Sequence, residues 1–279
     1  MSRTLLLSLT LAALALAGCD RNGSSSAPQP GAKPGHLTGK LADTHGKPLS
    51  GVTISVFGFS PNGEMIKRDV HIKGPATEYD IPLPDGKYDT PTARIGVEYN
   101  DRWYDLPLAA ADGTREWPQQ GEASRGMVRD FVWKISGRAP TGEVEDPAGY
   151  WGGTLQFDKG ADLGDTATLE ITLTPDGPLI DQSAGQPITF TRKLPWKRRE
   201  DHYLLDVPIG KYIATGKTLF GTNPKPLRLV SYTIDPTDVE ASTNTPKPTP
   251  RVTVEFECTE IKTNQWKLLI PNLVAFPPG

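Results

Sequence analysis

The sequence predicts an all-β protein composed of antiparallel β-sandwich domains. Many short segments alternate apolar and polar residues with a period of two, which is typical of strands with one buried face. Turn residues separate these segments at intervals common in sandwiches. Glycine (28) and proline (27) make up about a fifth of the 279 residues, which favours many turns but stays below low-complexity composition.

The first 18 residues read as a segment that directs export. Arg3 supplies a positive start, and the stretch from Leu5 to Ala17 is almost wholly apolar. This stretch is shorter than the roughly 20 residues that a membrane span needs. Small residues then precede a cleavage point, as in a secretory signal peptide.

The cleavage region, Leu16-Ala17-Gly18-Cys19, resembles the bacterial lipobox. The resemblance implies that Cys19 receives a diacylglycerol on its sulfur, typically with a further acyl group such as palmitate, and that the chain is cut before it. Two or more acyl chains hold a protein stably at a bilayer. Asp20 resembles a signal for retention in the inner membrane of enteric bacteria, although this rule varies between bacteria. The alternative is an ordinary signal peptide with an unrelated cysteine.

Residues 19–35 are rich in Ser, Pro and Gly and predict a flexible linker from the lipid to the first domain. The first domain is expected over 36–136. Thr53 and Ser55 alternate with apolar neighbours, and Asn62-Gly63 tolerates the positive φ of a tight hairpin. Strands are predicted at 37–41, 51–59, 65–72, 77–83, 92–99, 102–108 and 127–135.

Two motifs in this domain resemble the carboxypeptidase regulatory-like family, whose domains have a transthyretin-like (prealbumin-like) sandwich fold. The first runs from Gly39 to Ile54 and contains Gly46-Lys47-Pro48 between two strands. The second is Tyr79-Asp80-Ile81-Pro82-Leu83-Pro84-Asp85-Gly86-Lys87-Tyr88. The resemblance covers about 36–110. It implies the fold and says little about function, because such modules are joined to many different proteins.

Residues 137–279 predict a second β-sandwich domain. Leu169, Ile171 and Leu173 alternate with polar residues, and 206–212 (DVPIGKY) echoes 80–88 (DIPLPDGKY). The echo indicates either a duplicated sandwich or a chance repetition of strand-turn-strand chemistry. Residues 235–250 predict a polar loop, 266–276 a last strand, and 252–258 a strand with the Cys258 thiol buried on its apolar face.

Charge and motifs exclude several function classes. The formal net charge is −3, and the signal contributes only Arg3, so the mature chain is near −4, which argues against nucleic-acid binding. The sequence has no HExxH, GxSxG, P-loop or GxGxxG pattern. The clustered histidines of the transthyretin-like hydroxyisourate hydrolases are also missing. We therefore expect a protein that is not an enzyme and has no cofactor or metal, and we interpret Asp158, Asp162 and Asp165 as an acidic loop rather than a Ca²⁺ site.

Two residue groups are candidates for binding. The strongest run of positive charge surrounds a tryptophan, which suits either anionic lipid or glycan contact or a solvated turn; its members are Arg192, Lys193, Trp196, Lys197, Arg198 and Arg199. Clustered aromatic residues suit either sugar stacking or core packing; they are Tyr99, Trp103, Tyr104, Tyr150 and Trp151.

The prediction for function is a non-catalytic lipoprotein of the cell envelope. We expect it to be exported, held at the periplasmic side of a membrane by lipid on Cys19, and to act as a protein-interaction or scaffolding module. The alternative is a module that binds envelope or extracellular polysaccharide, and an unrecognised hydrolase is disfavoured.

Overall fold

The computed structural model describes residues 29–114, 121–140, 149–160, 163, 167–219, 224–233, 247–256, 258–262, 265–268 and 271–277. Side chains are described throughout these ranges except at 199, 200 and 258–268. All longer elements are strands, and the two described helices are short 3-10 turns, η1 (Ala123–Arg125) and η3 (Arg199–His202). In this part of the chain no helix has the length and apolar character to cross a bilayer. The prediction of an all-β protein with antiparallel sandwich sheets is confirmed.

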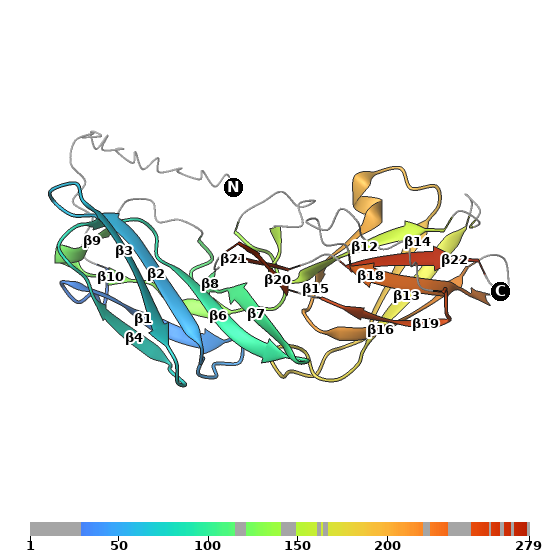
Figure 1. Cartoon of the computed structure of the whole chain (residues 1–279), viewed down its shortest axis with the longest axis horizontal. Helices are drawn as coiled ribbons and strands as arrows, with labels where there is room; N and C mark the ends of the chain where they lie inside the picture. The colour runs from blue at the N-terminus through green and yellow to red at the C-terminus, as the bar shows by residue number, and fades with distance from the viewer. Residues whose placement is uncertain are drawn as a thin grey trace, which may run out of the picture.

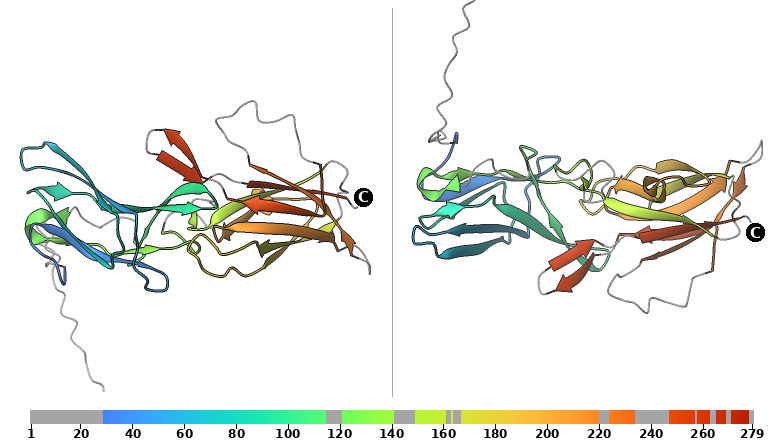
Figure 2. Two further views of the ribbon diagram at one scale, coloured as in Figure 1. Left: turned by 60° about the horizontal axis from the view of Figure 1, so that its bottom comes forward. Right: turned by 90° about the horizontal axis from the view of Figure 1, so that it is seen from above.

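The N-terminal half contains two sheets packed face to face (Figures 1 and 2). The first sheet consists of β1 (His36–Asp43), β4 (Glu78–Pro82), β8 (Ala109–Ala110), β10 (Met127–Val128) and β11 (Phe131–Trp133). The second consists of β2 (Val52–Phe59), β3 (Met65–Ile72), β5 (Lys87–Tyr88), β6 (Thr92–Tyr99), β7 (Arg102–Pro107) and β9 (Gly121–Glu122). We call this half the N-terminal sandwich.

The C-terminal half contains two further sheets, which form the C-terminal sandwich. One consists of β12 (Gly153–Lys159), β15 (Tyr203–Val207), β18 (Arg228–Thr233) and β22 (Pro271–Phe276). The other consists of β13 (Thr168–Pro175), β14 (Ile188–Lys193), β16 (Lys211–Thr218), β17 (Lys225–Pro226) and β19 (Arg251–Glu255). A separate hairpin, β20 (Cys258–Lys262) and β21 (Gln265–Leu268), lies near β7 of the other half (Figure 1).

The alternation seen in the sequence decides which side chains form the core. Val52, Ile54 and Val56 of β2 are at most 1% exposed, whereas their neighbours Thr53 and Ser55 face outward. In β13 the residues Leu169, Ile171 and Leu173 are all fully buried, and the intervening residues are not. A period of two places successive side chains on opposite faces of a sheet, so each strand contributes one row to the core.

The two sandwiches repeat one arrangement of strands. The order β4-β1-β11-β8 corresponds to β15-β12-β22-β18, and β3-β2-β6-β7 corresponds to β14-β13-β16-β19. In each, the first strand pairs in parallel with the last, β1 with β11 and β12 with β22. The order along the chain differs at one point. The equivalents of β7 and β8 are β19 and β18, and β7 precedes β8 whereas β19 follows β18.

The echoed sequence motif has the same role in both sandwiches. Tyr88 and Tyr212 are buried, and each hydroxyl donates to the carbonyl oxygen of the proline four residues earlier, Pro84 (2.9 Å) and Pro208 (2.6 Å). Burial raises the pKa of both phenols, so they stay neutral donors. Together with the repeated strand order, this shared bond supports the duplication rather than the chance repetition.

Three details of the predicted strands need correction. The strand expected over 127–135 is divided into β10 and β11, because the Asp130 side chain, rather than a strand carbonyl, accepts the hydrogen bond of Lys40 N (2.7 Å). The strand expected over 252–258 ends at Glu255, and Cys258 begins β20 instead. The segment expected as one last strand over 266–276 is divided between β21 and β22, and β22 is a central strand.

Candidate functional site: the seam between the two sandwiches

The hairpin formed by β6 and β7 fastens the N-terminal sandwich to the C-terminal one. The Tyr99 hydroxyl donates to Pro178 O (2.9 Å) and accepts from Lys211 N (3.0 Å). The Tyr104 hydroxyl donates to Phe256 O (2.6 Å). Both tyrosines belong to the N-terminal sandwich, whereas all three partners belong to the C-terminal one. We call this set of three hydrogen bonds the tyrosine clamp.

The turn of this hairpin adds a further contact. Asn100 and Asp101 adopt positive φ (49° and 59°), which is the backbone of a tight two-residue hairpin turn. The Asn100 amide donates to the Glu255 carboxylate (3.0 Å), next to the Phe256 carbonyl that the clamp uses. The hairpin thus extends three polar side chains, those of Tyr99, Asn100 and Tyr104, to the other sandwich.

Burial in the clamp contradicts part of the sugar-stacking prediction. Tyr99 is 6% exposed and Tyr104 is fully buried, with the two rings in edge contact at 5.9 Å, so neither offers a face to a sugar. Trp103 is half exposed, because adjacent residues of a strand point to opposite faces. Its indole covers Gly96 on the neighbouring strand, where a Cβ atom would overlap the ring.

The described ends of the segment that connects the sandwiches pair with each other and with the C-terminal sandwich. Ala139 N donates to Gly149 O and Trp151 N to Gly137 O, both at 2.9 Å, so the described ends of this segment pair as a short ribbon. The Asp206 carboxylate accepts from Gly137 N (2.7 Å) and lies 3.3 Å from a second backbone N–H, that of Gly152. Asp206 itself has φ 61°, a left-handed conformation that Asp tolerates better than most residues.

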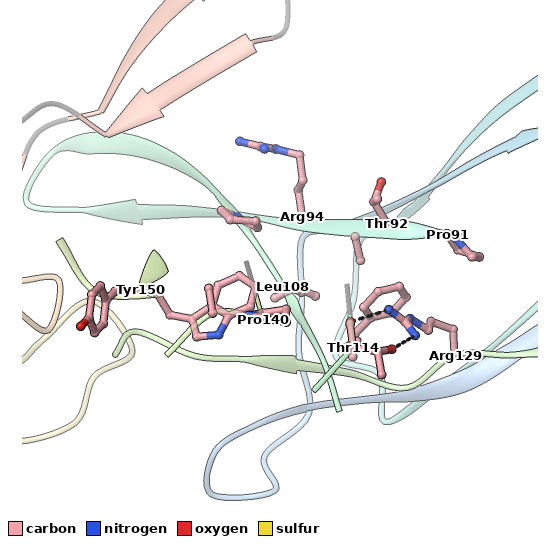
Figure 3. A pocket seen from close by; sticks show the side chains of 14 residues that line it. Pro91, Thr92, Arg94, Leu108, Thr114, Arg129, Pro140 and Tyr150 are labelled. Carbon is pink, nitrogen blue, oxygen red and sulfur yellow. Dashed lines mark hydrogen bonds between the residues drawn. The ribbon is translucent and has the colours of Figure 1, made fainter. Parts of the chain in front are cut away.

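A cavity of about 440 Å³ lies between the N-terminal sandwich and the described ends of the connecting segment (Figure 3). Its walls are mainly apolar or aromatic, with a few polar groups, and its lining includes Ala93, Leu108, Thr114, Arg129, Phe131, Pro140, Tyr150 and Trp151. This volume is within the range of small-molecule sites. Two of the five aromatic residues predicted for stacking, Tyr150 and Trp151, therefore lie together in a concave surface.

The charged groups of the cavity are held in hydrogen bonds. Arg129 is 3% exposed and its guanidinium bonds to the Thr114 hydroxyl (2.9 Å), the Thr114 carbonyl (2.8 Å) and the Asp112 carboxylate (3.1 Å). Arg94 points away from Arg129 in Figure 3 and pairs with Asp105 at 2.7 Å. Because each cation has a carboxylate partner, the cavity suits a neutral ligand with hydroxyl groups and an apolar face better than a strongly charged one.

The basic run of the sequence has a structural role. Arg192 donates to Asp201 O (2.9 Å) and Tyr203 O (2.7 Å), and its guanidinium lies 5.0 Å from the Phe190 ring centroid. The Asp201 carboxylate accepts the backbone N–H groups of Lys197 (3.0 Å) and Arg198, which hold its pKa below the usual range. These bonds shape the turn between β14 and β15.

Trp196, predicted to lie either at a membrane or glycan interface or in a solvated turn, packs part of its ring against the C-terminal sandwich. Trp196 is half-buried, and its ring packs against Phe157 (5.6 Å between centroids) and His202 (4.5 Å). The side chains of Lys193, Lys197 and Arg198 remain exposed, and the Arg199 side chain lies outside the described part of the structure. The tryptophan therefore anchors the turn, and only the outward cations keep the predicted exposure.

The C-terminal end of the predicted linker is bonded to the N-terminal sandwich. Gly35 N donates to Ala123 O (2.7 Å), Val128 N donates to the Gln29 side chain (2.9 Å), and Lys33 pairs with Asp80 (2.7 Å). The expected linker over 19–35 thus docks on the N-terminal sandwich from Gln29 onward.

Several other predicted residues lie outside the described part of the structure. These are the signal segment, Cys19, Asp20, Asp162 and Asp165, together with the side chain of Cys258. The remaining residue of the acidic loop, Asp158, lies 3.3 Å from His202 Nδ1. Among the described residues, no three His, Cys, Asp or Glu side chains gather as metal ligands would.

An exposed apolar group at the turn of the β2–β3 hairpin was not predicted. Phe57 is 37% exposed, Phe59 41% and Met65 67%, and the two phenylalanine rings meet edge to face at 5.3 Å. The signal was present in the sequence, since Phe57 and Phe59 continue the outward row that begins with Thr53 and Ser55. We call Phe57, Phe59 and Met65 the tip patch.

Comparison with known proteins gives no family. No family model matches the chain, and no curated protein matches it. Among solved structures, a C-terminal fragment of the pilus adhesin SpaC from Lactobacillus rhamnosus GG aligns with 88% of this chain and 98% of its own, at 11% identity and a TM-score of 0.27. A leucine-rich repeat protein from Bacteroides thetaiotaomicron VPI-5482 aligns with 88% of this chain at 12% identity and a TM-score of 0.21, and the chain spans about a quarter (26%) of that protein. Similarity at this level carries no argument about function.

Proposed function

We propose that this protein is a lipid-anchored, non-catalytic binding protein of the bacterial cell envelope that acts as a scaffold for a protein partner. The lipobox-like Leu16-Ala17-Gly18-Cys19 supports the anchor. The carboxypeptidase regulatory-like motifs support the sandwich fold on which such a module is built.

The observation that carries the scaffold proposal is the tyrosine clamp. Interfaces between domains of one chain are commonly small and polar, and relative motion is then the default. Here Tyr99 and Tyr104 are buried and bonded to backbone atoms of the other sandwich, so the two halves hold a fixed geometry. Fixed geometry is useful to a scaffold, because it presents one surface at a constant distance from the anchored end.

Edge strands offer this scaffold a means of binding. Among the described strands, β14 of the C-terminal sandwich pairs only with β13, which leaves its other edge open. An extended segment of a partner can add to such an edge through backbone hydrogen bonds. We propose β14 as the partner-binding edge, because it lies in the sandwich farther from the anchor.

The test is a cross-linked pull-down of the tagged, lipidated protein from intact cells, read by mass spectrometry. A near-stoichiometric protein partner, lost when Thr189 and Thr191 of β14 are both replaced by Pro, would support the scaffold. The matched control replaces Arg251 and Thr253 of β19 by Gln and Val; β19 pairs with β16 on the other side of the same sheet, so no pairing of β14 changes. If no protein is enriched from cells, the scaffold proposal fails.

Polysaccharide binding is a second candidate, favoured by one observation. Tyr150 and Trp151 line the 440 Å³ cavity together with hydroxyl and apolar groups, which is the composition that sugar rings stack on. Retardation of the protein in a polysaccharide-loaded native gel, lost with Trp151→Ala and kept with Trp103→Ala, would support it. Equal mobility with and without polysaccharide would exclude it.

A further inference from the structure

We propose that the tip patch of Phe57, Phe59 and Met65 contacts the surface of the bilayer that holds the Cys19 lipid. The inference rests on the lipid anchor in the proposed function and adds a second membrane contact to it. A single exposed apolar residue needs no explanation, but three adjacent large ones on an outward sheet face indicate a contact surface.

The tip patch lies beside the point where the anchored end of the chain joins the fold. Phe59 pairs with Lys87, and Lys87 pairs with Glu122. The next residue, Ala123, accepts the hydrogen bond from Gly35 N. Two strand neighbours therefore separate the patch from the docked linker, and in Figure 1 β9 and β10 lie at the end of the molecule away from the C-terminal sandwich.

The length of chain between Cys19 and Gln29 keeps this end near the bilayer. Ten residues lead from Cys19 to Gln29, whose side chain bonds to the sandwich. Covalent geometry limits them to a reach of about 35 Å when fully extended. A tether of this length gives an effective concentration on the order of millimolar, so even a weak affinity of the tip patch suffices for contact.

The surroundings of the patch suit the interfacial region of a bilayer. Lys67 stands opposite Phe57 and Lys87 opposite Phe59, and both lysines are exposed. Their long side chains reach headgroup phosphates while the aromatic rings enter the acyl boundary. Glu64 and Asp85, also exposed and near the same turn, offset these charges, so the contact depends mainly on apolar burial.

The experiment uses the lipidated protein with Cys258→Ser and Asn62→Cys, so that a fluorescent probe labels the hairpin turn, since lipid blocks the Cys19 sulfur. The protein is placed in vesicles of phosphatidylethanolamine and phosphatidylglycerol that contain a lipid-borne quencher. We expect the probe to be quenched severalfold more than the same probe at Lys225→Cys in the C-terminal sandwich. The variant F57S/F59S/M65S should weaken the membrane contact about tenfold or more, whereas W103S, which removes an equally exposed aromatic far from the tip, should not.

The outcomes are distinct from those of the anchor itself. If Cys19 carries no lipid, no variant floats with the vesicles, and the anchor fails. If all variants float but quenching at position 62 equals that at 225, or survives F57S/F59S/M65S in a protein with unchanged melting temperature, the tip-patch proposal is overturned. Loss of a protein partner with F57S/F59S/M65S while quenching persists would also overturn it, and would assign the patch to that partner.

Discussion

The tyrosine clamp predicts that the two sandwiches unfold together, and removing its hydroxyls tests this directly. The perturbation is Tyr99→Phe and Tyr104→Phe, separately and together. Each change keeps the ring and removes the hydroxyl, and with it the hydrogen bonds that cross the seam. The matched controls are Tyr88→Phe and Tyr212→Phe, which delete a hydroxyl bond to a carbonyl within one sandwich.

The magnitude follows from the number of bonds and from burial. A neutral hydrogen bond contributes about 1 kcal/mol net, and a buried partner left unsatisfied costs about 1–3 kcal/mol. Tyr99 makes two bonds across the seam, so Tyr99→Phe should lower the free energy of unfolding by about 2 kcal/mol. Tyr104 makes one, so Tyr104→Phe should cost about 1 kcal/mol, rising toward 3 kcal/mol because the residue is fully buried. The double variant need not equal the sum, because the two rings are in contact.

Calorimetry and urea unfolding followed by tryptophan fluorescence are the assays. For a chain of this size 1 kcal/mol shifts the melting temperature by about 2–4 °C. We expect one transition for the natural protein and two separated transitions for the double variant. The controls should lower the stability of one sandwich by a similar amount without weakening the seam. A double variant that keeps a single transition with stability unchanged within about 0.5 kcal/mol would show that the clamp does not couple the sandwiches.

Three further predictions concern other parts of the fold. Gly39→Ala should destabilise by several kcal/mol, because the added Cβ would overlap a backbone carbonyl, whereas Gly74→Ala, with open space around it, should change stability by under about 0.5 kcal/mol in chemical denaturation. Trp196→Ala should lower the free energy of unfolding by about 3 kcal/mol in the same assay, because its ring packs against Phe157 and His202. An unchanged stability would show that this packing does not stabilise the fold. The hydrogen bond from Lys33 lowers the pKa of Asp80 in the folded protein. The Asp80 carboxylate therefore stabilises the docked linker fully above its unfolded pKa of about 3.8, and this stabilisation is lost as the pH falls through the lower pKa of the folded state. Limited proteolysis after Gln29 should therefore be faster in Asp80→Asn than in the natural protein at neutral pH. In the natural protein it should become faster only when the pH falls below the folded pKa of Asp80. Equally slow cleavage of both proteins at neutral pH would contradict the role of Asp80.

Some elements were predictable because their signals are local. The strands at 65–72 and 92–99 match β3 and β6 at both ends, since alternation and flanking turn residues are properties of the segment itself. The strand expected over 252–258 failed because its alternation continues to Cys258 while the chain leaves β16 after Glu255. At the next residue, Phe256, the carbonyl oxygen accepts the Tyr104 hydroxyl of the other half instead of pairing with β16, and no local pattern contains this contact.

In the candidate sites, too, the exposure of a side chain depends on contacts that the local sequence does not contain. Tyr104 and Trp103 are adjacent aromatic residues, yet one is fully buried and the other half exposed. Alternation predicts that they point to opposite faces, but it does not state which face another sandwich covers. Arg192 and Trp196 likewise read as a basic aromatic patch until their hydrogen bonds and ring contacts are known. Phe57 and Phe59 are the converse case, in which the pattern already placed apolar rings on an outward face.

The sequence by itself determined the all-β class, the inward rows of the strands, the turns, and the repeated motif that ends in Tyr88 and Tyr212. These depend on backbone geometry and on side-chain period, which act over a few residues. Only the tertiary structure decided that Tyr99 and Tyr104 join the two sandwiches, that Tyr150 and Trp151 share a cavity, and that the tip patch lies beside the docked linker. Each of these depends on which segments distant in the chain meet, and that is set by the packing of whole sheets rather than by any single strand.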